Sequence, residues 1–400
     1  MLQPASADYV PDVVNLLLKA ARQFRASDIH LVPTEHSLRM QWRIDGVLHS
    51  VAAFDGDLKS RMVARLKVMA GLLTYRTDVP QEGRISTAGI DGEVRVTTFP
   101  TLFGEKAAIR LFAESGQFQL LQELNLPSDV EQLLSRFLRQ TSGVILLTGP
   151  SGSGKTTTVY ACLRELVRMF GDARGLMSLE DPIEVVVPGV TQSQVRPNVG
   201  FDLATGLKSM MRQDPDVIMV GEIRDPETAE SAFQAALTGH LVITTFHAGS
   251  SVEAVTRLLD MGIEPYLLRS TLQVVVCQRL LRKACSACGA TEQAADHNEP
   301  SSATWKNSGK ETDKTSDRGA HAESCSLCGG LRYHGRFVTA EVLDPAVPDV
   351  GRGLMERMDS KMLQQMAVSG GMATLRDRCE QAVRDGLTYA DEVFRVLGMR

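Results

Sequence analysis

The sequence contains no apolar run long enough to span a bilayer, and its first residues do not form a secretory signal. We therefore expect a cytoplasmic protein whose contact with a membrane is peripheral. An excess of positive charge is also missing: 43 lysines and arginines stand against 48 acidic residues, which gives a formal net charge of −5. This balance argues against nucleic acid as the main partner.

What the sequence does contain is typical of a globular protein. Its 400 residues are enough for two or three domains, each with a buried core. Apolar residues make up 43% of the chain and charged residues 23%. Four of the seven cysteines form two Cys-x-x-Cys pairs, which fit a metal site in a reducing compartment better than they fit disulfides.

A glycine-rich segment, Gly149–Thr158, reads GPSGSGKTTT. The apolar run Val144–Leu147 precedes it and apolar residues at helical spacing follow it, which is the order of elements around a phosphate-binding loop. Glycine lets successive backbone N–H groups point into one concavity, and the N-terminus of the following helix adds its positive end. We expect the Lys155 ammonium to reach the β- and γ-phosphates of a nucleotide, and the Thr156 hydroxyl to ligate Mg²⁺.

Seven other loop residues are expected to contact the nucleotide: Gly149, Pro150, Ser151, Gly152, Ser153, Gly154 and Thr157. The alternative is an ordinary glycine-rich surface turn. Such a turn would not need a lysine and a threonine between a strand and a helix.

A second motif is the apolar run Val217–Val220, which leads into Gly221 and Glu222. A buried strand followed by an acidic residue is typical of a Walker B element, whose carboxylate orients water or holds Mg²⁺ near the γ-phosphate. We therefore predict that Glu222 is the catalytic base or water-positioning group, rather than a solvated carboxylate at a strand end. Other apolar runs, at 176–179 and 241–245, alternate with helical patterns and predict a parallel sheet. A strand between the two motifs places the chain, by fold analogy, with the RecA-like ATPases.

Several stretches follow one another in a characteristic order. Glu180–Glu184 reads EDPIE, Arg212–Asp225 reads RQDPDVIMVGEIRD and Thr238–Ala248 reads TGHLVITTFHA. They resemble the Asp box, Walker B box and His box of the secretion ATPase superfamily, and most closely its type II secretion and type IV pilus-assembly branch. Four earlier stretches resemble the same branch: Ser27–Leu31, Arg43–Gly46, Pro80–Arg84 and Pro100–Arg110.

The resemblance implies roles for particular residues. It makes Glu222 the Walker B glutamate and His247 a catalytic-site residue. It also implies nucleotide or Mg²⁺ contacts for Glu180, Asp181, Glu184, Arg212 and His240. From the residues alone, a neutral histidine can donate to a phosphate oxygen or be a satisfied core residue.

Two arginines of the first domain are further candidates. Arg95 and Arg110 each lie between apolar neighbours on a predicted strand, so alternation turns them to the face opposite those neighbours. The resemblance implies that they approach the nucleotide when the domains close and complete the positive charge around the γ-phosphate. Without it, both would be interpreted as solvated strand arginines.

The cysteine pairs Cys285/Cys288 and Cys325/Cys328 can supply four tetrahedral ligands to Zn²⁺. The spacing between the pairs is longer than in a compact knuckle, and the polar stretch 289–324 accounts for the excess as a predicted flexible excursion. The pairs resemble the metal-binding subdomain of the assembly branch. The alternative is four reduced thiols without a metal.

We expect an α/β protein in two main parts. Residues 1–112 form an α+β domain, PAS-like by the resemblance, with helices near 13–21 and 58–73, and 113–125 form a linker. Residues 126–400 form the RecA-like ATPase domain, including a four-cysteine metal-binding subdomain at about 280–336 and C-terminal helices.

The function implied by the resemblance is that of a hexameric ATPase using ATP, Mg²⁺ and Zn²⁺. It would power type II secretion pseudopilus or type IV pilus assembly through a platform protein at the cytoplasmic face of the inner membrane. The alternatives are a nucleotide-gated structural subunit with little turnover and a pilus retraction motor.

Three departures from the branch stand out. Residues 344–349 read DPAVPD, where retraction motors carry a charged helical signature, and this favours assembly or secretion. Lys208 stands where the branch commonly has arginine. The chain also begins almost directly at what resembles the second domain of its branch.

Overall fold

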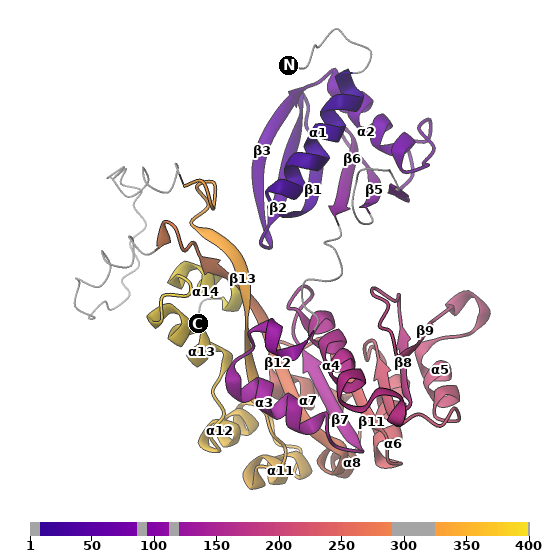
Figure 1. Cartoon of the computed structure of the whole chain (residues 1–400), viewed down its shortest axis with the longest axis vertical. Helices are drawn as coiled ribbons and strands as arrows, with labels where there is room; N and C mark the ends of the chain where they lie inside the picture. Colours follow the sequence, from indigo (N-terminus) through magenta and orange to yellow (C-terminus); the bar gives the residue numbers. More distant parts are fainter. Residues whose placement is uncertain (1–8, 86–93, 112–119, 290–324, 399–400) are drawn as a thin grey trace. The chain divides into compact units, whose positions relative to one another are not determined.

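The computed structural model describes residues 9–85, 94–111, 120–289 and 325–398, and it divides into two compact units, Met1–Gln117 and Phe118–Arg400 (Figure 1). The division falls inside the segment 113–125 that was predicted to be a linker. Within this segment the 3₁₀ helix η1 (Leu121–Leu124) buries both of its leucines in the core of the second unit. Residues 121–124 of the predicted linker therefore belong to the second unit. The excursion predicted at 289–324 lies, apart from Gly289, outside the described residues.

The first unit is a six-stranded antiparallel sheet in the order β3-β2-β1-β6-β5-β4. Helices α1 and α2 pack on the face that carries the apolar side chains, such as Ile29 and Val96. The opposite face carries polar side chains. The elements are α1 (Tyr9–Gln23), β1 (Ala26–Pro33), β2 (Ser37–Ile44), β3 (Val47–Asp55), α2 (Leu58–Met69), β4 (Gln81–Ile85), β5 (Val94–Thr101) and β6 (Gly104–Leu111).

Local sequence explains the turns of this unit. Asp45 and Gly46 join β2 to β3 with φ of +47° and +86°, the left-handed pair that a two-residue hairpin of type I′ requires. The helix predicted to end near residue 73 ends at Met69, and Gly71 follows with φ of +68°.

The second unit is built on a seven-stranded sheet in the order β13-β12-β7-β11-β10-β8-β9. All neighbouring strands are parallel except β13, which pairs antiparallel with β12. The strands are β7 (Gly143–Thr148), β8 (Leu176–Glu180), β9 (Thr191–Gln194), β10 (Val217–Val220), β11 (Leu241–Phe246), β12 (Leu272–Ala284) and β13 (Tyr333–Leu343).

Helices cover both faces of this sheet. On one face η1, α3 (Ser128–Phe137) and α4 (Lys155–Phe170) form a core with the sheet. The other face is covered by α5 (Leu203–Met210), α6 (Pro226–Leu237), α7 (Ser251–Asp260), α8 (Pro265–Thr271), α11 (Pro348–Met355) and α12 (Ser360–Ser369). Strands β7, β10 and β11 are buried throughout, which is why their sequences are continuous apolar runs. The predicted parallel sheet is therefore confirmed.

Because β7, β11 and β10 are parallel neighbours, their carboxyl-terminal ends lie at the same edge of the sheet. We call this edge the carboxyl edge and the opposite one the amino edge. Ligands of open parallel sheets bind outside the carboxyl edge. The predicted C-terminal helices are also present: α13 (Leu375–Arg384) and α14 (Ala390–Leu397) follow α12 and pack on β13 and β12 respectively.

Candidate functional site

The glycine-rich loop connects β7 to α4 in a backbone conformation that needs glycine. Gly149, Gly152 and Gly154 have φ of +142°, +74° and +93°. A Cβ at Gly149 would lie 2.6 Å from the backbone oxygen of Gln278. Helix α4 begins directly after Gly154, so the unpaired N–H groups of its first turn open onto the loop. The loop can therefore hold phosphate groups.

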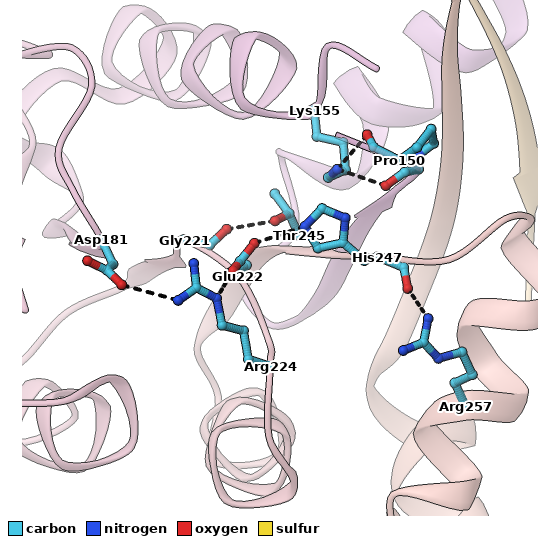
Figure 2. Close-up of polar contacts among 10 residues, drawn as sticks. Pro150, Lys155, Asp181, Gly221, Glu222, Arg224, Thr245, His247 and Arg257 are labelled. Atoms are coloured by element: carbon cyan, nitrogen blue, oxygen red, sulfur yellow. Dashed lines mark hydrogen bonds and ion pairs between the residues drawn. The ribbon is translucent and has the colours of Figure 1, made fainter. Parts of the chain in front are cut away.

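Lys155, the first residue of α4, is only 7% exposed. Its ammonium donates to the backbone oxygens of Gly149, at 2.8 Å, and Pro150, at 3.0 Å (Figure 2). Burial lowers the pKa of Lys155 to about 8, so the group remains charged at neutral pH. Thr156 and Thr157 are exposed in the same turn, where their hydroxyls can reach a ligand of the loop.

Glu222 and His247 meet at the carboxyl edge. Glu222 lies two residues beyond β10, His247 follows β11, and their Oε2 and Nε2 atoms are 3.2 Å apart (Figure 2). Burial, followed by the charges of Lys155 and Arg224, lowers the pKa of His247. The lowered pKa favours the neutral imidazole, whose N–H can donate a hydrogen bond to the carboxylate.

Two arginines bind Glu222 and His247 from outside the predicted set of site residues. Arg224 forms ion pairs with Glu222 and, at 3.3 Å, with Asp181 (Figure 2). Arg257 of α7 donates to the backbone oxygen of His247. The position of Arg224 two residues after the Walker B glutamate was a usable signal. Nothing in the local sequence marks Arg257.

Glu180 is the buried last residue of β8. It is 3% exposed, and its carboxylate accepts hydrogen bonds from Tyr160, Ser178 at 2.5 Å and Gln192 at 2.9 Å. A buried carboxylate with three donors anchors the end of β8, and the place of Glu180 near Mg²⁺ stays a prediction. Asp181 is exposed beyond β8, and the backbone N–H of Glu184 donates to the Tyr160 hydroxyl at 3.1 Å.

His240 and Arg212 also lie away from the loop of the same chain. His240 precedes β11, and its Nδ1 lies 2.8 Å from the backbone oxygen of Ala235. It is therefore at the amino edge, and β11 separates it from the P-loop by roughly 20 Å. Arg212 donates to the backbone oxygen of Lys208 at the end of α5, before β10 begins. The structure places both residues at the amino edge, and the nucleotide contacts implied for them stay predictions.

Arg95 and Arg110 lie opposite each other on β5 and β6, on the polar face of the first unit. Arg110 Nε lies 3.1 Å from Asp28 Oδ1, and Arg95 Nε lies 3.4 Å from Glu82 Oε1. Their strand register continues into a row across five strands. The row, which we call the arginine row, consists of Arg84, Arg95, Arg110, Asp28 and Arg43.

The four cysteines gather in one cluster, although 36 residues separate the two pairs in the sequence. All four sulfur atoms lie within 4.8 Å of one another. The Cys285–Cys325 and Cys288–Cys328 separations are 3.8 and 3.6 Å. A tetrahedral zinc with Zn–S bonds of about 2.3 Å separates its sulfur atoms by about 3.8 Å. The thiols therefore fit zinc, whereas a disulfide needs sulfur atoms about 2.05 Å apart.

Several buried polar residues near the loop were missed by sequence reasoning. Gln278 of β12 donates to Thr158 at 2.9 Å, and Arg279 donates to the backbone oxygen of Gly249 at 2.5 Å. Tyr160 of α4 is 3% exposed and donates to Glu180. The tyrosine sits among apolar helix positions, so periodicity marks it as a core residue only.

None of the helices within the described ranges has the length and apolar character needed to cross a bilayer.

The loop, the acidic residue on a neighbouring strand and the parallel sheet define a P-loop nucleotide-binding protein of RecA-like architecture. A family model described as "Type II/IV secretion system protein" matches residues 3–395, and the chain belongs to this family. The chain is 37% identical over 387 residues to the type II secretion system protein HxcR of Pseudomonas aeruginosa, covering 96% of this chain and 76% of that protein. It is 40% identical over 393 residues to the type II secretion system ATPase E of Vibrio cholerae, covering 96% and 74%.

Solved structures share the fold at lower identity. The pilus retraction motor PilT with bound ADP is 23% identical, with a TM-score of 0.58 and coverage of 96% of both chains. The Legionella pneumophila ATPase DotB is 19% identical, with a TM-score of 0.67 and coverage of 98% of this chain and 96% of that one. At 19–23% identity, these similarities support the RecA-like fold alone and do not distinguish one function of this fold from another.

Proposed function

We propose that this protein is a Mg²⁺-dependent ATPase that powers a type II secretion or type IV pilus-assembly machine. The observation that carries the proposal is the convergence of Lys155, Glu222 and His247 at the carboxyl edge, in a chain that is 40% identical to a type II secretion system ATPase. A site that only binds nucleotide does not need a carboxylate placed to activate water.

Each group has a distinct task. Lys155 and the N–H groups of α4 bind the phosphates, and the exposed Thr156 hydroxyl is the residue that would hold Mg²⁺. When bound, Mg²⁺ neutralises charge that develops on the phosphate oxygens. Glu222 accepts a proton from water or orients it, and His247 holds the carboxylate in place. Asp181 and Glu184 remain the acidic candidates for the Mg²⁺ side of the site.

Two alternatives lead to different measurements. A nucleotide-gated structural subunit would bind ATP but hardly hydrolyse it. A pilus retraction motor would share the fold, as PilT does, but the relatives at 37–40% identity are type II secretion proteins.

The decisive experiment compares three proteins in steady-state hydrolysis and in equilibrium binding of a non-hydrolysable ATP analogue. Lys155→Ala should lose both binding and hydrolysis, because it removes the charge on the β- and γ-phosphates but little core packing. Glu222→Gln should keep binding and lose turnover by about 100-fold or more, because shape remains and the base does not. Wild-type turnover in the Glu222→Gln protein would exclude the assigned role, and wild-type protein without turnover would favour the structural subunit.

The same proposal includes a zinc site and an assembly. The four-thiolate geometry of the cysteine cluster supports one structural Zn²⁺ per chain. We further propose a homo-hexamer that works with an inner-membrane platform protein, peripheral to the membrane on its cytoplasmic side. The family membership supports this arrangement.

A further inference from the structure

We infer that Tyr160 is a positioning residue for hydrolysis, whose hydroxyl fixes the acidic segment Glu180–Glu184 to the P-loop helix α4. The inference rests on the proposed ATPase function and adds to it a residue that neither binds nucleotide nor reacts. It also gives the buried Glu180 carboxylate a structural task.

The Tyr160 hydroxyl makes three hydrogen bonds, two to the ends of this segment and one to the residue after it. It donates to the buried Glu180 carboxylate and accepts the backbone N–H groups of Glu184, at 3.1 Å, and Val185, at 3.3 Å. Burial, together with the hydrogen bond to Glu180, raises the pKa of Tyr160, so the hydroxyl keeps the proton that it donates. One oxygen therefore fixes the segment at its beginning and at its end.

Glu180 is held from the other side by residues of β8 and β9. Ser178 donates to its Oε1 at 2.5 Å, and Gln192 donates to the same atom at 2.9 Å. Gln192 also donates to the backbone oxygen of Val185 at 3.0 Å. Because each of these groups has a partner in the buried network, the segment has one well-defined position relative to α4.

This position matters for the catalytic carboxylate. Asp181, the residue after the anchor, pairs with Arg224 at 3.3 Å, and Arg224 in turn pairs with Glu222 (Figure 2). Lys155 lies five residues before Tyr160 on α4. The contacts thus run without a break from the P-loop helix through the acidic segment to Glu222. Removing the hydroxyl leaves two backbone N–H groups and a buried carboxylate each short of a partner.

The chain offers a matched control in Tyr333. This tyrosine is 6% exposed and donates to the Asp391 carboxylate at 2.8 Å, and burial again raises its pKa. It pairs with Ala284 on β12, seven residues beyond Cys277, which pairs with Thr148 at the end of β7. That is about 23 Å along the strand. Tyr333→Phe therefore removes the same kind of bond far from the P-loop.

The test compares wild-type protein, Tyr160→Phe and Tyr333→Phe in melting temperature, in kcat and KM for Mg-ATP, and in amide hydrogen exchange of residues 181–186. Both variants should melt at a lower temperature. Only Tyr160→Phe should lower kcat, by about tenfold with KM changed less than about twofold, because the loss falls on the geometry of reaction. It should also speed exchange of the Glu184 and Val185 amides, which lose their acceptor.

Tyr160→Phe protein with wild-type kcat and the same loss of melting temperature as Tyr333→Phe would overturn the inference. Wild-type protein that does not hydrolyse ATP would instead refute the proposed function, and exchange then decides about Tyr160. A Mg²⁺-loaded, non-hydrolysable ATP analogue should slow exchange of residues 181–186 in wild-type and Tyr333→Phe protein, but less in Tyr160→Phe. Equal protection in all three would overturn the inference.

Discussion

At the scale of single residues, Lys155 combines a necessary charge with a buried position. Burial lowers its pKa to about 8 in the folded protein, from an ordinary value of 10.5, because the ammonium gives up water for two backbone oxygens. Below pH 8 the group is charged and can bind phosphate. Above pH 8 the nucleotide-free protein loses this proton, and binding must take one up.

We therefore predict that affinity for a non-hydrolysable ATP analogue falls above pH 8, by up to about tenfold per pH unit. Equilibrium binding between pH 7 and 9.5 measures this dependence. Lys155→Arg is the control, because an arginine keeps its charge throughout the range. An affinity that stays constant to pH 9.5 in the wild-type protein would show that Lys155 does not titrate.

Residue roles could be predicted where a local pattern defines the environment. Lys155 and Glu222 follow apolar strands, and a strand end at the carboxyl edge of a parallel sheet is a reliable location. Glu180 is the last residue of β8, yet its carboxylate is occupied by Tyr160 and Gln192, which are 20 and 12 residues away. No local pattern reports such contacts. Its role in the structure therefore could not be predicted from the sequence.

At the scale of elements, the cysteine cluster links the C-terminal end of β12 to the N-terminal end of β13. The Cys285 N–H donates to the backbone oxygen of Arg332, and Arg282 stacks 3.8 Å over the Tyr333 ring. Tyr333 also contacts the Tyr389 ring edge-on at 5.4 Å, next to α14. The cysteine cluster thus lies where the C-terminal helices join the sheet, at a distance from the P-loop.

We predict about one Zn²⁺ per chain in freshly purified protein. Replacing Cys285 and Cys288 by serine should release the metal and speed hydrogen exchange in β13 and α14, while the P-loop keeps its protection. Elemental analysis and exchange by peptide measure both effects. Cys379→Ser makes the same chemical change at a buried cysteine of α13 outside the cluster, and should retain zinc. Wild-type protein without zinc would contradict the site.

Strands could be predicted from the sequence where they are uniformly apolar. Strand β12 could not, because it contains buried polar residues. Strands β7, β10 and β11 are buried on both faces and appear in the sequence as apolar runs. Strand β12 has 13 residues but includes Gln278 and Arg279, which are 0% and 8% exposed. Their polar atoms bond to Thr158 and to the Gly249 backbone oxygen, so they can lie inside a buried strand. Periodicity alone cannot show that these partners exist.

Buried carboxylates join elements in a similar way. Glu341 of β13 is 3% exposed and accepts from the Ser251 N–H at 2.7 Å and from the Leu375 N–H at 2.9 Å. These two groups begin α7 and α13, so one carboxylate receives the positive ends of two helices. Helix α13 is thereby fixed to the segment that follows His247.

At the scale of the whole molecule, the two units present complementary chemistry. In the proposed function, the second unit binds phosphate through the buried Lys155 and positions water through Glu222. Transfer of a γ-phosphoryl group develops charge that commonly requires an arginine in addition. The first unit carries the arginine row on its polar face, with Arg95 and Arg110 opposite each other and Arg110 62% exposed. We propose that these two arginines take part in hydrolysis.

We predict that Arg95→Ala or Arg110→Ala lowers kcat by about 10³-fold, as loss of an arginine finger does, with a smaller change in nucleotide affinity. Steady-state kinetics beside equilibrium binding of a non-hydrolysable analogue separate the two effects. Arg39→Ala is the matched control, because it removes the same charge from an exposed position on the same face of β2.

The Arg39→Ala control distinguishes a general electrostatic effect of the arginine row from direct contacts that individual arginines make with the phosphate. If the row acts only through its general positive potential, Arg39→Ala, Arg95→Ala and Arg110→Ala should all reduce activity modestly, and added salt should reduce it further. If individual guanidinium groups contact the reacting phosphate, only the two row variants should lose kcat, and Arg110→Lys should restore little because an ammonium lacks the planar pair of donors. Unchanged turnover in both row variants would mean that the first unit has no catalytic task, and that the second unit completes its site without these arginines.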